Sequence, residues 1–373
     1  MVEYVRLLAP ALTEVSARIF QAAGGSRAEA LEIASNLVAA NLAGHDSHGV
    51  FRIPRYLDWV KRGYLRFGQH ISVITENTVM ASLNGNDGFG QVLGREAVEF
   101  GLAKAQPTGL SLVALRHGGH LGRIGAWAEL AAEAGYVSIH FVNVANSQLV
   151  APYGGRERRM STAPVAIGIP NGADDHFILD FSTARSAESK ILVAYESGKA
   201  VPEGNLIDAD GKFTTDPLAL YGKVNVGAAP NPRGGSGALV AMGDHKGSGL
   251  ALACELLAGV VTGSGTAGGG TQAWNGMLSI YIDPKMIDRA QNFPAAVSGY
   301  IDFVRSCKPQ AGVEGVMVPG DPERRCRKDR LVNRIPLAAD GWNKIIQSAE
   351  ALGVSRDTIL EILDAAAGDK KNG

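Results

Sequence analysis

The sequence predicts an α/β protein that has a large mixed sheet in its core and helical segments at both ends. Between residues 71 and 284, apolar segments with strand-like alternation are separated by segments with helical spacing, which is typical of an α/β core. Residues 4–64 and those after 340 repeat their apolar side chains at helical spacing. Two alternating segments within 71–83 predict a hairpin, so the sheet is expected to be mixed and not purely parallel.

The N-terminal part begins with a predicted helix at 4–23, which Gly24 and Gly25 end. Ser26 and Glu29 follow with the spacing of a capping box, in which the two side chains bond backbone amides at the start of a helix. The helix that they open leads into the stretch 41–56. Pro54 in that stretch is expected in the first turn of the next helix.

The stretch 41–56 concentrates ionisable side chains: His45, Asp46, Ser47, His48, Arg52 and Arg55. A histidine exchanges a proton near neutral pH. An arginine four residues later lies on the same face if the segment is helical, and its planar fork matches a carboxylate. This combination suits a small acid that has a carbonyl or hydroxyl next to its carboxyl group. The alternative is a capped helix junction with solvated charges.

The predicted core elements follow one another along the chain. After the hairpin we expect a helix at 91–105, a strand at 110–117, a helix after Arg123, strands at 136–144, 164–170 and 176–182, a helix at 184–198, a strand and helix within 238–263, a strand at 276–284 and a helix at 293–306. The polar segment 199–237 is expected to be a lid or irregular surface.

Polar residues follow several of these strands, and ligands of open α/β sheets bind beyond the carboxyl ends of strands. The turns at 117–123 and 143–147 have this position. Lys246 stands between a strand and a helix, where it could meet a phosphate or be a solvated turn residue. Asp180 ends a strand, where it could bond a ribose hydroxyl, orient a histidine or cap a helix.

Two common functional motifs occur only in positions or forms that do not match their usual function. A GxGxxG at 263–268 follows a helical pattern and precedes a strand, so it predicts a flexible surface loop and not an ordinary Rossmann fingerprint. The pairs His45/His48 and His117/His120 lack the HExxH form of a zinc helix. A metal-dependent hydrolase or lyase that uses these four histidines remains an alternative, as does a non-catalytic sugar-acid or nucleotide-binding protein.

Composition narrows the class of protein. The 373-residue chain has a formal net charge of −1, so no nucleic-acid partner is expected. Its three cysteines (Cys254, Cys307, Cys326) are too far apart to predict a disulfide framework. No apolar run reaches the roughly 20 residues of a membrane span, and the acidic, amphipathic start is not a signal peptide. We expect a cytoplasmic protein, with solvated charges at 156–159 and 321–330.

Together the motifs resemble the malate/L-lactate dehydrogenase family, which lacks a Rossmann domain and includes ureidoglycolate dehydrogenases and cyclic imino-acid reductases. Within it, the chain is most similar to the hydroxycarboxylate dehydrogenase B subgroup. The matching pieces are NLAGHDSHG (41–49), GRIGAWAE (122–129), GYVSIHFV (135–142), VAPYGGRERR (150–159), ILDFST (178–183), the PEGNLID–TTDP region (202–217), HKGSGLALACELLAGVVTG (245–263) and VPGDPE (318–323).

The resemblance implies a mixed α/β fold that is not a Rossmann fold, and an oxidoreductase that moves a hydride between NAD(P)H and a 2-oxo acid. It also implies a homodimer with its active site near the subunit interface. Residues 1–70 would carry the catalytic loop and pack with the C-terminal helices at 330–373, while 71–329 would bind cofactor and substrate. An acid near the ribose favours NAD and an arginine favours NADP, so Asp180 and Arg185 point opposite ways, with NAD preferred.

The resemblance also assigns residues. His48 corresponds to the proton donor and acceptor, acting as an imidazolium in reduction, and His120 to a second active-site histidine that polarises the carbonyl or competes for that role. Arg52 corresponds to the carboxylate-binding arginine, with Ser47 and Tyr56 beside the substrate. The cofactor positions are Gly122, Arg123, Ile124, Ser147, Ile178, Leu179, Asp180, Phe181, Ser182, Lys246, Gly320 and Asp321; no metal site is expected.

The chain departs from the family pattern at three places. It has STAP at 161–164 where many relatives have GTNP, so Ala163 replaces an asparagine. Ser189 stands before Lys190 where many relatives have glycine, and Arg185 adds a charge just after the predicted cofactor strand. These departures concern cofactor choice and substrate shape more than the class of reaction.

Overall fold

The computed structural model describes residues 3–172, 175–196, 198–223, 231–268, 270, 272–288 and 292–368. Residues 224–230 of the polar segment and residue 197 of the helix expected at 184–198 lie outside this range.

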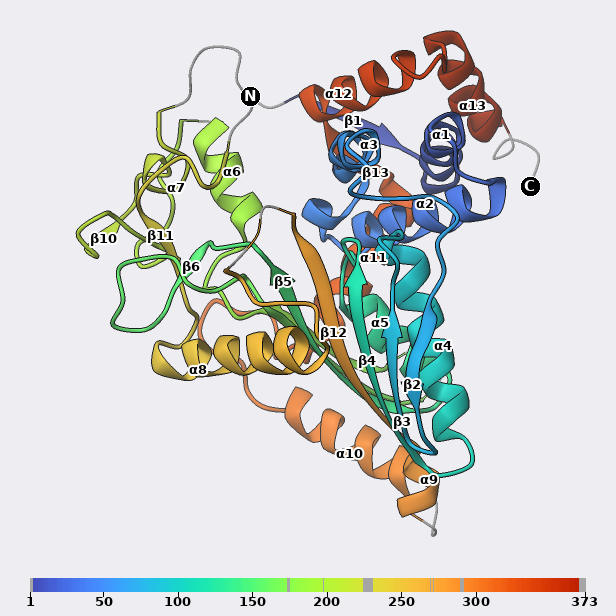
Figure 1. The fold of residues 1–373 in the computed structure, drawn as a ribbon, viewed down its shortest axis with the longest axis vertical. Helices are drawn as coiled ribbons and strands as arrows, with labels where there is room; N and C mark the ends of the chain where they lie inside the picture. Colours follow the sequence, from blue (N-terminus) through green and yellow to red (C-terminus); the bar gives the residue numbers. More distant parts are fainter. Residues whose placement is uncertain are drawn as a thin grey trace.

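A seven-stranded mixed sheet forms the centre of the molecule (Figure 1), which confirms the predicted fold class. In spatial order its strands are β2 (Ser72–Glu76), β3 (Met80–Asn84), β4 (Leu110–Gly118), β12 (Trp274–Ile282), β5 (Val137–Ala145), β7 (Pro164–Ile169) and β8 (Phe177–Ser182). The predicted hairpin is β2–β3, which pairs antiparallel, whereas β3 and β4 are parallel. Strand β12, from late in the chain, lies between β4 and β5 and pairs antiparallel with both.

Helices α4 (Gly90–Ala105) and α5 (Gly125–Glu133) pack on the sheet and on each other. The packing is close because glycine stands at the contacts. A Cβ atom added at Gly94 would lie 2.4 Å from the Trp127 ring, and one at Gly101 would lie 2.2 Å from the Tyr281 ring. The Trp127 side chain of α5 is consequently buried in the core against α4.

The two ends of the chain form one helical layer, at the upper right of Figure 1. It contains α1 (Ala9–Ala22), α2 (Arg27–Leu42), α3 (Ile53–Lys61), α12 (Ala339–Glu350) and α13 (Arg356–Gly368). Side chains from both ends, such as Phe20, Leu37 and Ile345, share one hydrophobic core. The Ser26 hydroxyl accepts the Glu29 amide at 3.2 Å, as the capping pattern predicts, whereas the Glu29 carboxylate accepts the Gly68 amide at 3.0 Å, so half of the capping box forms.

The helix expected at 4–23 is wrong in its first turn. Residues Tyr4–Leu7 form strand β1, which pairs antiparallel with β13 (Ile335–Ala338). The helix starts only at Ala9, next to Pro10, which favours the first turn of a helix. The pairing joins residues more than 300 positions apart, so no local pattern announces it.

A smaller sheet lies beside the first, to the left in Figure 1, in the order β10 (Phe213–Thr214), β9 (Leu206–Ile207), β11 (Ala238–Val240) and β6 (Val150–Ala151). Helices α6 (Glu188–Glu196) and α7 (Leu218–Tyr221) accompany it. The segment expected as irregular surface therefore contains short strands and a short helix. Strands of two residues are too short to show a period of two.

The remaining helices complete the chain: α8 (His245–Cys254), which continues as the π-helical segment Glu255–Val261, α9 (Pro284–Ile287), α10 (Phe293–Arg305) and α11 (Asp321–Asn333). Helix α11 corrects the expectation of solvated charges at 321–330, since its Glu323 and Arg330 bond the loop at 45–46. Within the described ranges, no helix combines the length and hydropathy that crossing a membrane requires.

Candidate active site

The loop that follows α2 is built around Asn41. The buried Asn41 side chain accepts the Val50 amide at 2.9 Å and donates to Asp46 Oδ1 at 2.6 Å. Gly49 is required beside it, because an added Cβ would lie 2.2 Å from Asn41 Oδ1. Arg330 of α11 clamps Asp46 from outside with contacts of 2.6 and 2.9 Å. The loop therefore folds as two short 3₁₀ turns, Asp46–His48 and Val50–Arg52, before α3 begins.

This loop brings His48 against His120, which follows strand β4. Their rings stack with centroids 5.5 Å apart and an interplanar angle of 15°. The Tyr56 hydroxyl, from α3, lies 2.6 Å from His120 Nδ1, and the Ser47 hydroxyl lies 3.0 Å from His48 Nδ1. The structure thus brings together both predicted histidines and both residues expected beside the substrate.

Arg52 lies next to the same pair. Its Nε donates to the Ser47 carbonyl at 2.6 Å, which fixes the guanidinium on the histidine side of the loop. Its charge lowers the pKa of both His48 and His120. A fixed cation beside two imidazoles can hold a carboxylate while the rings act on the adjacent carbon and oxygen.

The surroundings of both histidines favour the neutral ring. Burial, and next the charge of Arg52, lower the pKa of His48 to about 3. Burial, and next Arg52 and His48, lower the pKa of His120 well below its usual value. Burial also raises the pKa of Tyr56 to about 12. The lowered pKa favours His48 as a base over the imidazolium form that was expected.

The turn at Gly122–Ile124 meets strand β8 at Gly125, the first residue of α5. Asp180 Oδ2 accepts the Gly125 amide at 2.8 Å, so Asp180 caps this helix, as one of the three alternatives predicted. A Cβ added at Gly125 would lie 2.6 Å from Arg123 Nη1 and 2.8 Å from Asp180 Oδ2. Burial raises the pKa of Asp180, and the Arg123 charge opposes that rise.

Arg123 has buried N–H donors that could bind an anion. The residue is 2% exposed and pairs with Glu129, yet its Nε and Nη1 have no hydrogen-bond partner in the described part of the chain. A buried guanidinium with unpaired N–H groups is costly unless a ligand satisfies them. This orphaned donor set, beside a glycine turn and a helix start, fits a phosphate group of a dinucleotide.

Six of the other predicted cofactor residues lie on strand β8 or in the segment next to it. Ile178, Leu179, Phe181 and Ser182 continue β8 on either side of Asp180, and the Ile178 amide donates to Pro319 O at 3.3 Å, which places Gly320 beside the strand. Asp321 is engaged by Arg305 and Arg324, at 2.7 and 2.6 Å.

Lys246 and Ser147 occupy a more open region. Lys246 is exposed in the first turn of α8, and this turn follows β11 close to the end of β8, since the Met242 amide donates to Thr183 O at 2.8 Å. Ser147 follows β5, and no hydrogen bond in the described residues joins it to Arg123 or Asp180.

The GxGxxG segment at 263–268 is not the flexible loop that was expected. Asn143 Nδ2 donates to Gly265 O at 2.8 Å, and the Ala267 amide donates to Glu255 Oε2 at 2.9 Å. Ser264 and Ala267 are buried. The segment follows the π-helical segment and precedes β12, so it lacks the strand-to-helix context of a dinucleotide turn.

The two H-x-x-H pairs do not converge. His45 bonds Glu323 at 3.0 Å, and the His117 ring lies 6.4 Å from the Trp274 ring, so only His48 and His120 face each other. Among the residues that the structure describes, histidine, cysteine and acidic side chains form no group of three that could hold a metal ion.

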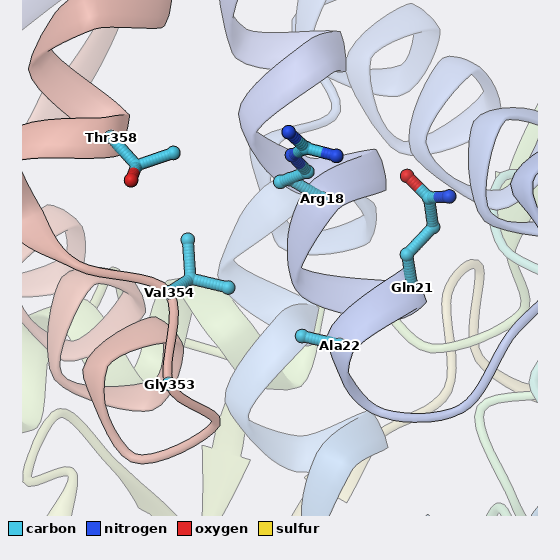
Figure 2. A pocket seen from close by; sticks show the side chains of 6 residues that line it. All are labelled: Arg18, Gln21, Ala22, Gly353, Val354 and Thr358. Carbon is cyan, nitrogen blue, oxygen red and sulfur yellow. The ribbon is translucent and has the colours of Figure 1, made fainter.

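A shallow groove of about 340 Å³ lies on the outer helical layer (Figure 2). It is lined by Arg18, Gln21, Ala22, Gly353, Val354 and Thr358. None of the predicted site residues lines it, so this groove is separate from the histidine pair.

Comparison with known proteins identifies the family of the chain. The family model described as malate/L-lactate dehydrogenase matches residues 8–346. Hydroxycarboxylate dehydrogenase B from Escherichia coli (strain K12) is 35% identical over 347 residues, which cover 91% of this chain and 92% of that protein. The sequence resemblance to this subgroup is thereby confirmed.

Solved structures share the fold. Sulfolactate dehydrogenase from Methanocaldococcus jannaschii has a TM-score of 0.82 at 30% identity, covering 94% of this chain and 98% of that one. Δ1-piperideine-2-carboxylate reductase from Pseudomonas syringae pvar. tomato has a TM-score of 0.75 at 26% identity, covering 92% and 100%. With a family match across most of its length, the chain belongs to the malate/L-lactate dehydrogenase family.

Proposed function

We propose that the protein is an NAD(P)-dependent 2-hydroxy acid dehydrogenase that interconverts a 2-hydroxy acid and the corresponding 2-oxo acid. The stacked, neutral pair His48–His120 beside the fixed guanidinium of Arg52 carries this proposal. A carboxylate clamp and a proton-transfer group within one loop match the two neighbouring functional groups of such an acid. The dehydrogenase names of the relatives support the same class.

The residues would divide the work as follows. Arg52 holds the substrate carboxylate and thereby orients the carbon that bears the hydroxyl, which is a positioning contribution. In oxidation, neutral His48 accepts the hydroxyl proton; in reduction the protonated ring returns it. The nicotinamide, when bound, accepts or supplies the hydride. His120 faces the same substrate oxygen.

For the cofactor, Arg123 would bind a phosphate through its two unpaired donors, next to Gly122 and Asp180. We favour NAD over NADP because the Arg185 side chain is directed at Gly204, where an added Cβ would lie 2.5 Å from Arg185 Nη1. An arginine in this position lies next to the segment before β9 and would not face the ribose of the cofactor. Lys246 and Ser147 would contact the cofactor from α8 and the end of β5.

We also propose a cytoplasmic homodimer. Leu252, Leu256 and Val260 recur every fourth residue along α8 and the π-helical segment, and are 53%, 49% and 58% exposed. An apolar stripe of this kind is typical of a covered helix face. Lys246 lies in the first turn of the same helix, so a second copy seated on it would lie near the cofactor region. Three free cysteines agree with a reducing compartment.

The carboxylate clamp has a direct test. Arg52→Leu should lower kcat/KM for a 2-oxo acid by at least ~100-fold, which corresponds to a charge-assisted bond of about 2–3 kcal/mol. The same change should have little effect on the methyl ester, which lacks the charge. Arg55→Leu, on the exposed side of α3, is the matched control and should keep most of the activity. Equal losses on acid and ester would contradict the clamp.

A cyclic imino acid is the second candidate substrate, because the chain shares its fold with a Δ1-piperideine-2-carboxylate reductase. Such a substrate also presents a carboxylate next to an unsaturated carbon. Reduction of the cyclic imine with no turnover of 2-oxo acids would favour this candidate.

A further inference from the structure

We propose that Gln91 and Tyr56 hold the neutral ring of His120 in the tautomer that carries its proton on Nε2. His120 is then a fixed hydrogen-bond donor toward the substrate oxygen, and proton transfer belongs to His48. The tautomer follows from the contacts within the protein alone, whereas the division of roles rests on the proposed function.

The orientation of the Gln91 amide is the first step. Gln91 is 1% exposed, and its Nε2 lies 3.3 Å from the His120 carbonyl oxygen and 3.0 Å from Tyr56 Oη. A carbonyl oxygen only accepts, so the group facing it must be the NH₂ of the amide. The opposite orientation would place two oxygens against each other. The second N–H of the same group therefore points at the Tyr56 hydroxyl.

The Tyr56 hydroxyl is the second step. Because Tyr56 Oη accepts from Gln91, its own proton is free to go to His120 Nδ1, 2.6 Å away. If His120 Nδ1 carried a proton instead, the buried Tyr56 O–H would need another acceptor. The described residues offer it no other hydrogen-bond partner, and an unpaired buried O–H is costly. The arrangement with Nδ1 as acceptor pairs the Tyr56 hydroxyl, His120 Nδ1 and Gln91 Nε2, and leaves Gln91 Oε1 without a partner among the described residues.

The consequence for the ring follows from its charge. Burial keeps His120 neutral, so a ring whose Nδ1 accepts must carry its single proton on Nε2. His120 can then donate through Nε2 but cannot accept a proton there. It could give up the Nε2 proton only by drawing the Tyr56 proton onto Nδ1, which would leave a buried tyrosinate. Burial raises the pKa of Tyr56 to about 12, which opposes that step.

The roles of the two histidines therefore separate. In oxidation, the O–H bond of the hydroxy acid breaks and its proton bonds to a ring nitrogen of His48, while the C–H bond breaks and its electron pair leaves as hydride to the nicotinamide. His120 Nε2–H stabilises the charge that develops on the oxygen. Reduction reverses both transfers. Tyr56 and Gln91 act through His120 and are positioning residues.

The tautomer can be measured without substrate. In protein labelled with ¹⁵N-histidine, protonated and unprotonated ring nitrogens have well-separated NMR shifts, and His120→Gln identifies the His120 signals. Wild type at pH 7 should show His120 with a protonated Nε2 and a bare Nδ1. A protonated Nδ1, or a doubly protonated ring, would overturn the proposal.

Two variants sharpen the test. Tyr56→Phe and Gln91→Leu should each give a measurable fraction of Nδ1-protonated His120, while the His140 signals stay unchanged because that ring is held by Ser138 and Ser279. An unchanged His120 pattern in folded Tyr56→Phe would also overturn the proposal. If a variant does not fold, the wild-type spectrum still decides.

The kinetic consequence separates this inference from the proposed function. Tyr56→Phe should lower kcat for 2-oxo acid reduction, approaching the roughly 10²–10³-fold loss that follows removal of an oxyanion donor, while KM for the cofactor stays within about twofold. An enzyme that turns over 2-oxo acids but shows the other tautomer contradicts the present inference alone. The predicted tautomer without any turnover contradicts the proposed function alone.

Discussion

At the scale of single residues, the site depends on keeping the stacked rings of His48 and His120 uncharged. Half-buried His48 and His120 both have a lowered pKa, first because of desolvation and next because of the Arg52 guanidinium beside them. A neutral histidine is ready to accept a proton from a hydroxyl, whereas a charged one would repel the arginine that orients the substrate. The same environment that lowers the pKa thus selects the form that hydroxy acid oxidation needs.

This has a consequence for pH dependence. A base works when it is deprotonated, so activity is lost only as pH falls through its pKa in the folded protein, about 3 for His48. The value of kcat/KM for hydroxy acid oxidation, which reports on the free enzyme, should therefore show no imidazole limb between pH 5 and 8. A fall in kcat/KM with an apparent pKa of 6–7 would contradict the buried, neutral His48.

At the scale of structural elements, the π-helical segment Glu255–Val261 binds two neighbouring segments through one buried carboxylate. Glu255 accepts from the Ser161 amide at 3.0 Å, the Ser161 hydroxyl at 2.5 Å and the Ala267 amide at 2.9 Å. The turn at 161–164 in turn receives the Ser182 hydroxyl, 2.9 Å from Thr162 O. Glu255 therefore connects the 263–268 segment with the end of the predicted cofactor strand.

Removing the Glu255 carboxylate should destabilise the folded protein. Glu255→Leu leaves two buried amides without acceptors, at about 1–3 kcal/mol each, so we expect it to lower the free energy of unfolding by at least ~2 kcal/mol. Ser161→Ala removes the bonds of the hydroxyl to Glu255 and to the Val144 amide and should cost about 0.5–1.5 kcal/mol for each. Urea denaturation of both variants checks this. No cost for Glu255→Leu would show that the carboxylate does not hold these elements together.

Sequence patterns anticipated the elements whose signal is local. The hairpin β2–β3, the buried strand β4 and the Ser26 cap before α2 follow from residues that are neighbours along the chain. Strand β1 was missed because its partner β13 lies at the other end of the chain. Helix α11 was missed because DPERRCRKDR has no apolar stripe. Its Glu323 and Arg330 side chains instead bond His45 and Asp46.

Some residues of the candidate site could likewise be predicted from local sequence, whereas others are brought to the site only by the fold. The motif at 41–56 pointed to His48 and Arg52, and the turn after β4 pointed to His120. Gln91 was not predicted, because in sequence it is one polar residue at the start of an apolar helix, and only the fold places it against Tyr56. The orphaned donors of Arg123 are likewise visible only when its burial is known.

At the scale of the whole molecule, the single chain does not explain the exposed apolar stripe of Leu252, Leu256 and Val260. We expect a homodimer with a mass of twice 39.1 kDa. Leu256→Glu places a charge in the centre of the stripe and should give monomers in light scattering coupled to size exclusion. Leu360→Glu, at a site equally exposed on α13 (50% against 49%), is the control and should remain dimeric. Dimers in both variants would exclude this face as the interface.

We expect the protein to catalyse hydride transfer between a nicotinamide cofactor and a 2-hydroxy or 2-oxo acid. The most direct measurement follows the absorbance of reduced nicotinamide when purified protein is mixed with NADH or NADPH and 2-oxo acids from pyruvate to phenylpyruvate. We predict oxidation of the cofactor with at least one acid, faster with NADH, and a roughly 10²–10⁴-fold lower rate for His48→Ala, as removal of a general acid–base group gives. His45→Ala, which loses only the bond to Glu323, should stay near wild type. No turnover with either cofactor in either direction, or full turnover by His48→Ala, would contradict the account.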